Sequence, residues 1–334
     1  MLTATARAHT NIALVKYWGK RDGLPDQNLP DVGSLSLTLA ELFTETKVEP
    51  AAADALELDG APAQASVAQR AFRHLDRVWS QSPQRDRSRP GCRVVSSNHV
   101  PTAAGLASSA SGFAALTLAA ATSFGLDPDR AALSALARRG SGSAARSMWG
   151  GFVRLDRGVL PDGSDCRARP LHTADHWDVR LVVARATARA KTVGSTEGMT
   201  RSRETSAYYP AWVDTSAADL DAAEQALAAR DLTALGRVVE RSCFKMHACM
   251  LASEPPLIYW NATSLNLVQA VFEARQMGLE GYLTSDAGPH IKVLCRREDA
   301  AAWADRLRHV ERVVDVAVLR PGPDATVTFE TAAR

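Results

Sequence analysis

Three serines and a glycine lie together in a run of small residues that leads into an apolar segment. The run covers residues 101–113, reads PTAAGLASSASGF, and contains Gly105 with serines at 108, 109 and 111. Apolar residues at helical spacing follow from about residue 110 to 124. A loop at a helix N-terminus presents free backbone N–H groups and the positive end of the helix dipole, which together bind anions such as phosphate. A tightly packed buried helix would use the same small residues, so composition alone does not separate the two interpretations.

This loop does not follow the common nucleotide-binding patterns. Neither GxxxxGK[ST] nor a GxGxxG after a strand occurs in the chain. A nucleotide bound at residues 101–113 would therefore be held by a different loop design.

A second group of candidate residues follows the first apolar run. Residues 11–23 read NIALVKYWGKRDG and place Lys16, Tyr17 and Lys20 beside Trp18, where an expected strand ends. An isolated pair of charges at a strand end is usually solvated. The same ammonium and hydroxyl groups could instead donate hydrogen bonds to a phosphorylated ligand, and the local sequence leaves both interpretations open.

Two later stretches carry an arginine and an aspartate suited to ligand chemistry. Arg146 follows the flexible run Gly140–Ser143 by three positions. An arginine beside flexible serines suits bidentate binding of a carboxylate or phosphate, which favours a ligand role over a purely structural loop. Asp286 opens the turn DAGP between two expected strands. Such an aspartate commonly bonds its own backbone, and the turn alone does not decide whether the carboxylate faces a ligand.

The expected elements place these stretches in an α+β protein. Alternating runs predict strands in the first half, at residues 2–8, 34–39, 44–49, 55–58 and 92–97, and an amphipathic helix at 65–79. Helical spacing dominates the second half, at residues 217–229, 232–250 and 265–277. The segment 194–205 is rich in Ser, Thr and Arg and is expected to be a loop that orders when ligand binds. This distribution favours an α+β arrangement over a doubly wound sheet.

Composition indicates an ordinary globular protein, and it leaves open a small phosphorylated ligand, which needs only a local basic pocket. The 334 residues are enough for two domains, and 39 basic against 37 acidic residues give a net charge of +2, which does not favour nucleic acid as a partner. The only candidate membrane span, about residues 103–126, is rich in Ser and Thr, so no membrane association is expected. The N-terminus lacks the apolar core of a signal peptide, and five cysteines without a CxxC pair indicate reduced thiols and no zinc site. We therefore expect a cytoplasmic protein.

Six stretches, in order along the chain, resemble the diphosphomevalonate decarboxylase family of the GHMP kinase superfamily. They are NIALVKYWGKRD at 11–22, PTAAGLASSASGFAAL at 101–116, RRGSGSAARSMWGGFV at 138–153, GSTEGM at 194–199, KMHA at 245–248 and DAGP at 286–289. Each stretch alone is a weak signal, whereas six in order along most of the chain are specific. The family converts mevalonate 5-diphosphate to isopentenyl diphosphate, consumes ATP, and releases ADP, phosphate and CO2.

The resemblance implies roles for individual residues. Asp286 matches the catalytic aspartate, which would orient the C3 hydroxyl or take its proton. Arg146 would bind the substrate carboxylate or stabilise charge during elimination, and Lys16 would also act in catalysis. The ATP phosphates would be held by Ala104, Gly105, Leu106, Ala107, Ser108 and Ser109, with Ser108 near Mg²⁺. The substrate-contacting positions would be Tyr17, Lys20, Ser141, Ser143, Arg146, Ser195 and Met199.

The resemblance also implies an architecture. We expect the two-lobed GHMP kinase fold, with a ribosomal protein S5 domain 2-like lobe over residues 1–186 and a ferredoxin-like α+β lobe over residues 187–334. The first lobe would carry the ATP loop, the second lobe would contribute Asp286, and the active site would lie in the cleft between them. A homodimer is expected because homodimers are common in the family.

Three alternatives to this function remain open. Thr196 stands where some relatives place an arginine that faces the diphosphate, and relatives of the same architecture act on mevalonate 5-phosphate. Others phosphorylate a mevalonate hydroxyl without decarboxylation. The presence of Asp286 and Arg146, together with Lys16 and Lys20, favours a decarboxylase over a simple kinase. The last alternative is a non-catalytic binding protein on this fold, against which the aspartate and the phosphate loop argue.

Overall fold

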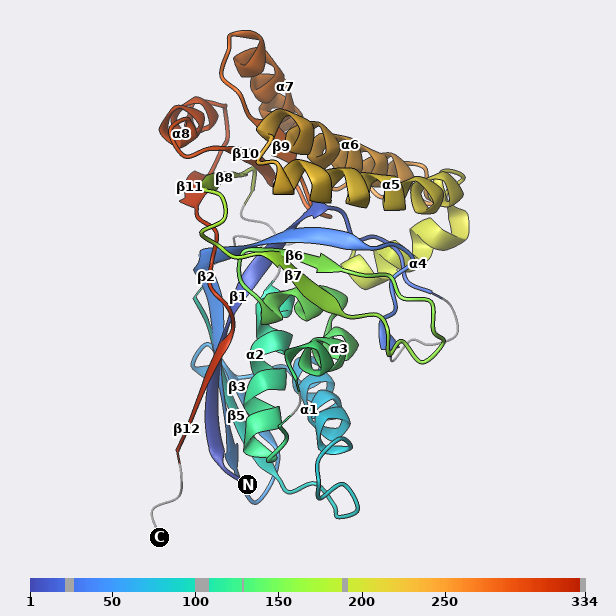
Figure 1. The fold of residues 1–334 in the computed structure, drawn as a ribbon, viewed down its shortest axis with the longest axis vertical. Coiled ribbons are helices and arrows are strands. Elements are labelled where there is room, and N and C mark those ends of the chain that lie inside the picture. The colour runs from blue at the N-terminus through green and yellow to red at the C-terminus, as the bar shows by residue number, and fades with distance from the viewer. Residues whose placement is uncertain (22–26, 100–107, 128, 188–191, 331–334) are drawn as a thin grey trace.

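Two β-sheets and the helices packed on them make up the protein (Figure 1). The computed structural model describes residues 1–21, 27–99, 108–127, 129–187 and 192–330. Strands are concentrated in the first half of the described chain and helices in the second half. The predicted α+β class is therefore confirmed.

The first sheet combines the N-terminal strands with one strand from near the C-terminus. Its strand order is β12-β1-β2-β5-β3-β4, while β6 pairs with β2 and with β7. The strands are β1 (Thr3–Val15), β2 (Ser34–Pro50), β3 (Ala55–Leu58), β4 (Ala61–Pro62), β5 (Cys92–His99), β6 (Phe152–Leu155), β7 (Ala168–His172) and β12 (Thr326–Glu330). Three helices, α1 (Ala65–Trp79), α2 (Ser108–Ser123) and α3 (Arg130–Gly140), lie beside this sheet in the lower half of Figure 1.

Strand β2 is longer than the sequence predicts. The expected strands at 34–39 and 44–49 form one continuous strand, so the break predicted between them is wrong. The alternating sequence pattern of β2 is interrupted at residues 40–43. At this point the register of β1 against β2 shifts, between His9 and Asn11 of β1. A register shift of this kind bends a strand without ending it.

The second sheet belongs to the other half of the molecule. Its order is β11-β8-β10-β9, built from β8 (Val179–Arg185), β9 (Tyr282–Thr284), β10 (Ile291–Arg296) and β11 (Asp315–Leu319). Helices α5 (Tyr209–Ala228), α6 (Leu232–Leu251), α7 (Ala262–Gln276) and α8 (Ala300–Arg308) gather at this end, at the top of Figure 1.

A shared hydrophobic core joins the two halves. Ile12 and Leu14 of β1 and Leu35 of β2 lie in one buried cluster with Leu235 and Val239 of α6. Sheet pairing also crosses the expected lobe boundary, because β8 pairs with β10 and β11, while β12 returns to pair with β1. The division at residues 186 and 187 stays a prediction, and strands from both sides of it contribute to both sheets.

The segment expected to be a loop at 194–205 is helix α4 (Ser195–Thr205). That expectation was based on its polar composition and is wrong for the described protein. Its polar residues stabilise the helix: Glu197 and Arg201, one turn apart, form an ion pair of 2.7 Å. On the opposite face Met199 and Ser202 are buried, and Ser253 donates a hydrogen bond of 2.9 Å to Ser202.

The structure also bears on the candidate membrane span and on the cysteines. In the part of the chain that the structure describes, no helix is both long enough and apolar enough to span a bilayer. All five cysteines lie in described segments, and each is free and buried.

Candidate active site

A cavity of about 420 Å³ lies where the two halves of the molecule meet. Its walls come from the end of β1, the segment after α3, helix α4 and the turn after β9. Every predicted site residue whose side chain the structure describes lines this cavity: Lys16, Tyr17, Lys20, Ser109, Ser141, Ser143, Arg146, Ser195, Met199 and Asp286. Ala104, Gly105, Leu106 and Ala107 lie outside the described residues. Ser108 begins α2, but its side chain is not among the described groups, so its contact with Mg²⁺ stays a prediction.

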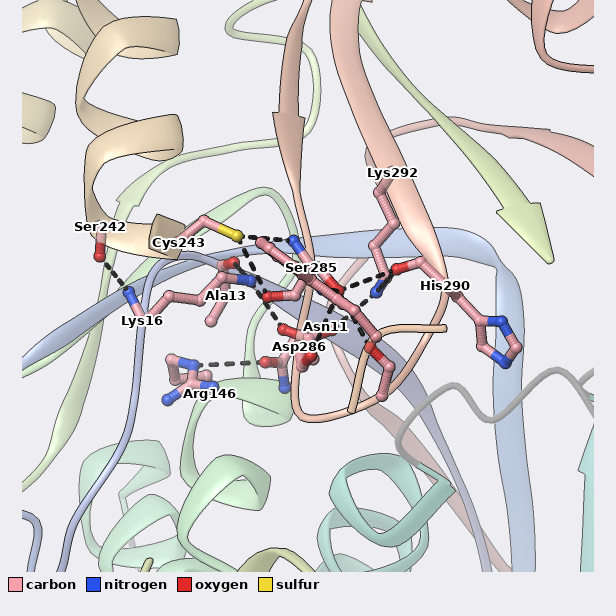
Figure 2. A network of polar contacts seen from close by, with 12 residues as sticks. Asn11, Ala13, Lys16, Arg146, Ser242, Cys243, Ser285, Asp286, His290 and Lys292 are labelled. Atoms are coloured by element: carbon pink, nitrogen blue, oxygen red, sulfur yellow. Dashed lines mark hydrogen bonds and ion pairs between the residues drawn. The ribbon is translucent and has the colours of Figure 1, made fainter. Parts of the chain in front are cut away.

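Asp286 is held between two lysines from different elements (Figure 2). Lys16, directly after β1, donates from Nζ to Oδ1 at 2.8 Å, and Lys292 on β10 lies 3.0 Å from Oδ2. Both lysine side chains are buried, at 1% and 3% exposure, whereas the aspartate side chain is 40% exposed. The carboxylate therefore faces the cavity while its two lysine partners are almost completely buried. Among the described residues, no hydrogen bond within its own turn holds the carboxylate.

This arrangement fixes the charge of Asp286. Burial alone would raise the pKa of the carboxyl group, but the charges of Lys16 and Lys292 and their hydrogen bonds outweigh burial and hold the pKa well below its usual range. Burial lowers the pKa of Lys292, while attraction to Asp286 opposes that shift. Asp286 is therefore an anion at neutral pH and a weak proton acceptor.

Lys292 is the functional candidate that sequence reasoning missed. It occupies the second position of β10, and its neighbours Ile291 and Val293 are fully buried. A lysine inside an apolar strand is uncommon unless it has a buried partner, and that pattern was the available signal. The signal did not identify the partner, because the partner depends on how the turn after β9 folds back.

Arg146 faces the same cavity from the 3₁₀ helix Gly142–Met148. Its Nε donates to Asn11 Oδ1 at 3.2 Å and its Nη1 donates to Ser34 Oγ at 2.7 Å. Asn11 is held in turn by Ser147 Oγ, which accepts from Asn11 Nδ2 at 2.7 Å. Burial lowers the pKa of Arg146 to about 10, so the guanidinium stays charged at neutral pH. Its hydrogen-bond partners are neutral, which leaves its charge available to an anionic ligand.

Lys20 provides another cation on the opposite wall. Its Nζ donates to Asn28 Oδ1 at 2.7 Å and lies 3.4 Å from Thr196 Oγ1. Burial, helped by the nearby positive charge of Arg70, lowers the pKa of Lys20 to about 8. The hydroxyl of Thr196, at the position where some relatives place an arginine, therefore contacts the cation that would meet a phosphate.

Small residues make room for Tyr17 between these groups. A Cβ at Gly142 would lie 2.2 Å from the Tyr17 hydroxyl, so no other residue fits at 142 without moving the ring. The Tyr17 ring lies 5.7 Å from the Arg146 guanidinium carbon. Burial raises the pKa of Tyr17, so its phenol remains a hydrogen-bond donor.

A second cavity of about 500 Å³ adjoins the first and shares Arg70 and Ser109 with it. It lies between the first sheet and helices α1 and α2, and its lining is largely apolar with a few polar groups: Leu56, Leu58, Val67, Val94, Phe113 and Leu116, with Thr46, Ser96 and Asn98. A largely apolar cavity beside a cationic one suits a ligand with a ring at one end and phosphates at the other. No cluster of three or more His, Cys, Asp or Glu side chains able to hold a metal occurs among the described residues.

The chain matches two family models and is similar in sequence to known proteins. Residues 8–168 match the diphosphomevalonate decarboxylase-like N-terminal domain, and residues 181–319 match the mevalonate 5-diphosphate decarboxylase C-terminal domain. The diphosphomevalonate decarboxylase of Candida albicans is 36% identical over 305 residues, which cover 87% of this chain and 83% of that protein.

Solved structures show the same fold. The crystal structure of mevalonate diphosphate decarboxylase from Staphylococcus aureus superposes with a TM-score of 0.90 at 34% identity and covers 98% of both chains. The structure of MDDEF in complex with MVAPP, AMPPCP and magnesium has a TM-score of 0.90 at 36% identity, covering 98% of this chain and 99% of that one. The two-lobed GHMP kinase fold that the sequence predicts is thus confirmed, and the chain belongs to the diphosphomevalonate decarboxylase family.

Proposed function

We propose that this protein catalyses the ATP-dependent decarboxylation of mevalonate 5-diphosphate to isopentenyl diphosphate. The observation that carries the proposal is the Asp286 carboxylate, held by two buried lysines at the wall of a cavity that Arg146 also lines. Family membership supports the reaction, and the charges in the cavity suit a substrate with a carboxylate at one end and a diphosphate at the other.

The reaction needs two steps, because a tertiary hydroxyl is a poor leaving group. In the first step the C3 oxygen of the substrate forms a bond to the γ-phosphorus of ATP, the bond from that phosphorus to the β–γ bridging oxygen breaks, and the hydroxyl proton is released as ADP departs. In the second step the C3–O bond breaks and phosphate leaves. The C1–C2 bond then supplies its electron pair to a C2=C3 double bond, and CO2 is released.

Asp286 would orient the C3 hydroxyl for attack on the γ-phosphate. Its lowered pKa supports an orienting role over that of a strong base, because a weakly basic carboxylate accepts a hydrogen bond without removing the proton first. Phosphoryl transfer passes through a loose transition state, so positioning of the hydroxyl provides most of the rate. The proton would leave as the new O–P bond forms.

Arg146 would bind the C1 carboxylate and stabilise charge as phosphate leaves. Its Nε and Nη1 contacts to neutral partners hold the guanidinium in place and leave its positive charge uncompensated by a carboxylate contact. Lys20, with Ser195 and Thr196 on the neighbouring wall, would contact the diphosphate, and Tyr17 would donate a hydrogen bond there. Ser141, Ser143 and Met199 would complete the substrate contacts.

The second cavity would take the nucleoside of ATP, with the phosphates directed toward Ser109 and Asp286 in the first cavity. The loop at 104–108 would hold those phosphates. Mg²⁺ in such sites keeps several waters and binds mainly to substrate phosphates, which fits the lack of a protein metal cluster among the described residues. When bound with ATP, Mg²⁺ neutralises phosphate charge. MDDEF binds MVAPP, AMPPCP and magnesium together, which supports this assignment of ATP and Mg²⁺.

The test is to supply Mg-ATP with mevalonate 5-diphosphate, mevalonate 5-phosphate or mevalonate, and to follow CO2 and ADP in parallel. We expect both products from the diphosphate alone. CO2 from the monophosphate would keep the mechanism and change the substrate, whereas ADP without CO2 would identify a kinase. Binding without turnover of any of the three would identify a non-catalytic protein. We also infer a homodimer in the cytoplasm, to be checked by light scattering and by fractionation of the source cells.

A further inference from the structure

Two consecutive residues of α6 contact the backbone of Lys16 and of Ser285, the residue before Asp286 (Figure 2). Ser242 Oγ accepts a hydrogen bond of 2.9 Å from the backbone N–H of Lys16. Cys243 Sγ accepts from the backbone N–H of Ser285 at 3.1 Å, and its thiol donates to the Ser285 carbonyl at 3.5 Å. Ser285 directly precedes Asp286 in the chain.

These contacts close a ring of interactions. The ring runs from Ser242 to Lys16, across the ion pair of 2.8 Å to Asp286, back along the chain to Ser285, and through Cys243 to α6 again. Lys16 belongs to the first half of the chain and Asp286 to the second half, 270 residues later. One turn of α6 is therefore the shared support of both groups.

Both backbone N–H groups that these two side chains bind lie at strand ends. Lys16 follows the last residue of β1, and Ser285 follows the last residue of β9, so each N–H lies where its ladder has ended. Ser242, Cys243 and Ser285 are fully buried, and water does not replace a lost contact there. Neither Ser242 nor Cys243 lines the cavity, so neither would touch substrate.

We infer that Ser242 and Cys243 are positioning residues that set the separation and orientation of Lys16 and Asp286 for catalysis. This inference rests on the proposed function, since it assigns a task to the reaction's ion pair. Loss of either contact would leave the fold intact but loosen the pair. A misplacement of about 1 Å at reacting groups can cost about a hundredfold in rate, so about a tenfold loss of kcat is expected from the smaller displacement that each substitution would cause.

The first experiment compares Ser242→Ala with Ser242→Thr, using Mg-ATP and mevalonate 5-diphosphate. We expect the alanine variant to lose about tenfold in kcat with little change in KM, and to have a somewhat lower Tm because the buried N–H of Lys16 is left unpaired. The threonine variant, which keeps an accepting hydroxyl, should recover most of the rate. Ser123→Ala is the matched control, because Ser123 is a buried helical serine whose hydroxyl donates to the Leu2 carbonyl, away from the cavity. Cys243→Ala, with Cys295→Ala as its control, provides a second variant should Ser242→Ala fail to fold.

Two further measurements separate positioning from general stability. In a Lys16→Ala background, Ser242→Ala should cost no further activity, because it acts through Lys16. In a crystal structure of Ser242→Ala, the distance from Lys16 Nζ to Asp286 Oδ1 should be longer than in the wild-type protein, where it is 2.8 Å, because the serine no longer holds the lysine backbone. This second measurement needs no turnover, so a wild-type protein that releases no CO2 refutes the proposed function without deciding the inference. An unchanged kcat, an additive loss in the Lys16→Ala background, or an unchanged distance between Lys16 and Asp286 would overturn the inference.

Discussion

Lys16 and Asp286 stand 270 positions apart in the chain and form an ion pair of 2.8 Å. The lysine side chain is 1% exposed and the aspartate side chain is 40% exposed, so the positive charge is withdrawn from solvent while the negative charge faces the cavity. Lys292 repeats this relationship from the second sheet at 3.0 Å. The Asp286 carboxylate is thereby supported from both halves of the molecule.

Replacement of Lys292 by methionine should weaken catalysis and shift its pH dependence. Lys292 helps to lower the pKa of Asp286, so its removal raises that pKa. If the ionised carboxylate is the active form, the acid limb of the kcat profile should move to higher pH. At neutral pH Asp286 stays ionised, so the loss of kcat expected there, about tenfold, comes from poorer positioning of its carboxylate. Steady-state rates across the pH range provide the measurement. Lys47→Met, which removes an exposed lysine paired with Glu49, is the control and should leave the profile unchanged.

Arg146→Lys should lower kcat about 100-fold, the size of effect seen when one preorganised charge-stabilising donor is lost. Lysine keeps the charge but cannot reproduce both the Nε contact to Asn11 and the Nη1 contact to Ser34. ADP and CO2 assayed in parallel would show whether phosphoryl transfer or decarboxylation is slowed. Arg154→Lys, in a surface ion-pair network on β6, should be nearly silent. A kcat for Arg146→Lys equal to that of the wild type would refute the role proposed for the Nε and Nη1 contacts of the guanidinium group.

Substrate affinity should fall as pH rises through the pKa of Lys20. Burial and Arg70 lower this pKa to about 8, so the ammonium is fully charged only below that pH and is neutral above it. A neutral amine no longer attracts a diphosphate, and KM for the substrate should therefore increase between about pH 7 and about pH 9. Lys20→Met should raise KM about tenfold or more at neutral pH and flatten this dependence, because a charge-assisted hydrogen bond is lost. An alkaline increase in KM that persists in Lys20→Met would assign it to another group.

Gly142→Ala should disturb the site through Tyr17. The new Cβ would lie 2.2 Å from the Tyr17 hydroxyl, which forces the ring to move. We expect a higher KM for the substrate and a loss of about 1 to 3 kcal/mol in the free energy of unfolding, as for other overpacked sites. Chemical denaturation and substrate kinetics on the same preparation test both effects. A variant with wild-type stability and KM would show that Tyr17 has room that the structure does not suggest.

Much of the fold and most of the site could be predicted from the sequence. The helix at 65–79 was predicted with its observed ends, because its apolar residues recur with helical spacing. Every predicted site residue with a described side chain lines one cavity, because the resemblance related motifs that local pattern alone could not connect. The roles of these residues stay predictions until they are measured.

Other features depend on tertiary structure and could not be predicted in this way. Lys292 was missed because its partner lies across a turn whose course is set by packing against α6. The segment 194–205 was expected to be a loop because its composition is polar, but an ion pair and a buried Met199 face stabilise it as a helix. Strand β2 continues through residues 40–43, where its register against β1 shifts and the Ala40 N–H donates a hydrogen bond of 3.0 Å to the Arg320 carbonyl, a contact that no local pattern could indicate.

The most direct test of this account is a single-turnover measurement of ADP and CO2 from mevalonate 5-diphosphate and Mg-ATP, with wild-type protein and Asp286→Asn. The account predicts equal amounts of both products from the wild type. It predicts loss of both from the variant, because a neutral amide between two buried lysines neither balances their charge nor orients the C3 hydroxyl in the same way. Equal rates of ADP and CO2 formation in wild type and Asp286→Asn would contradict it.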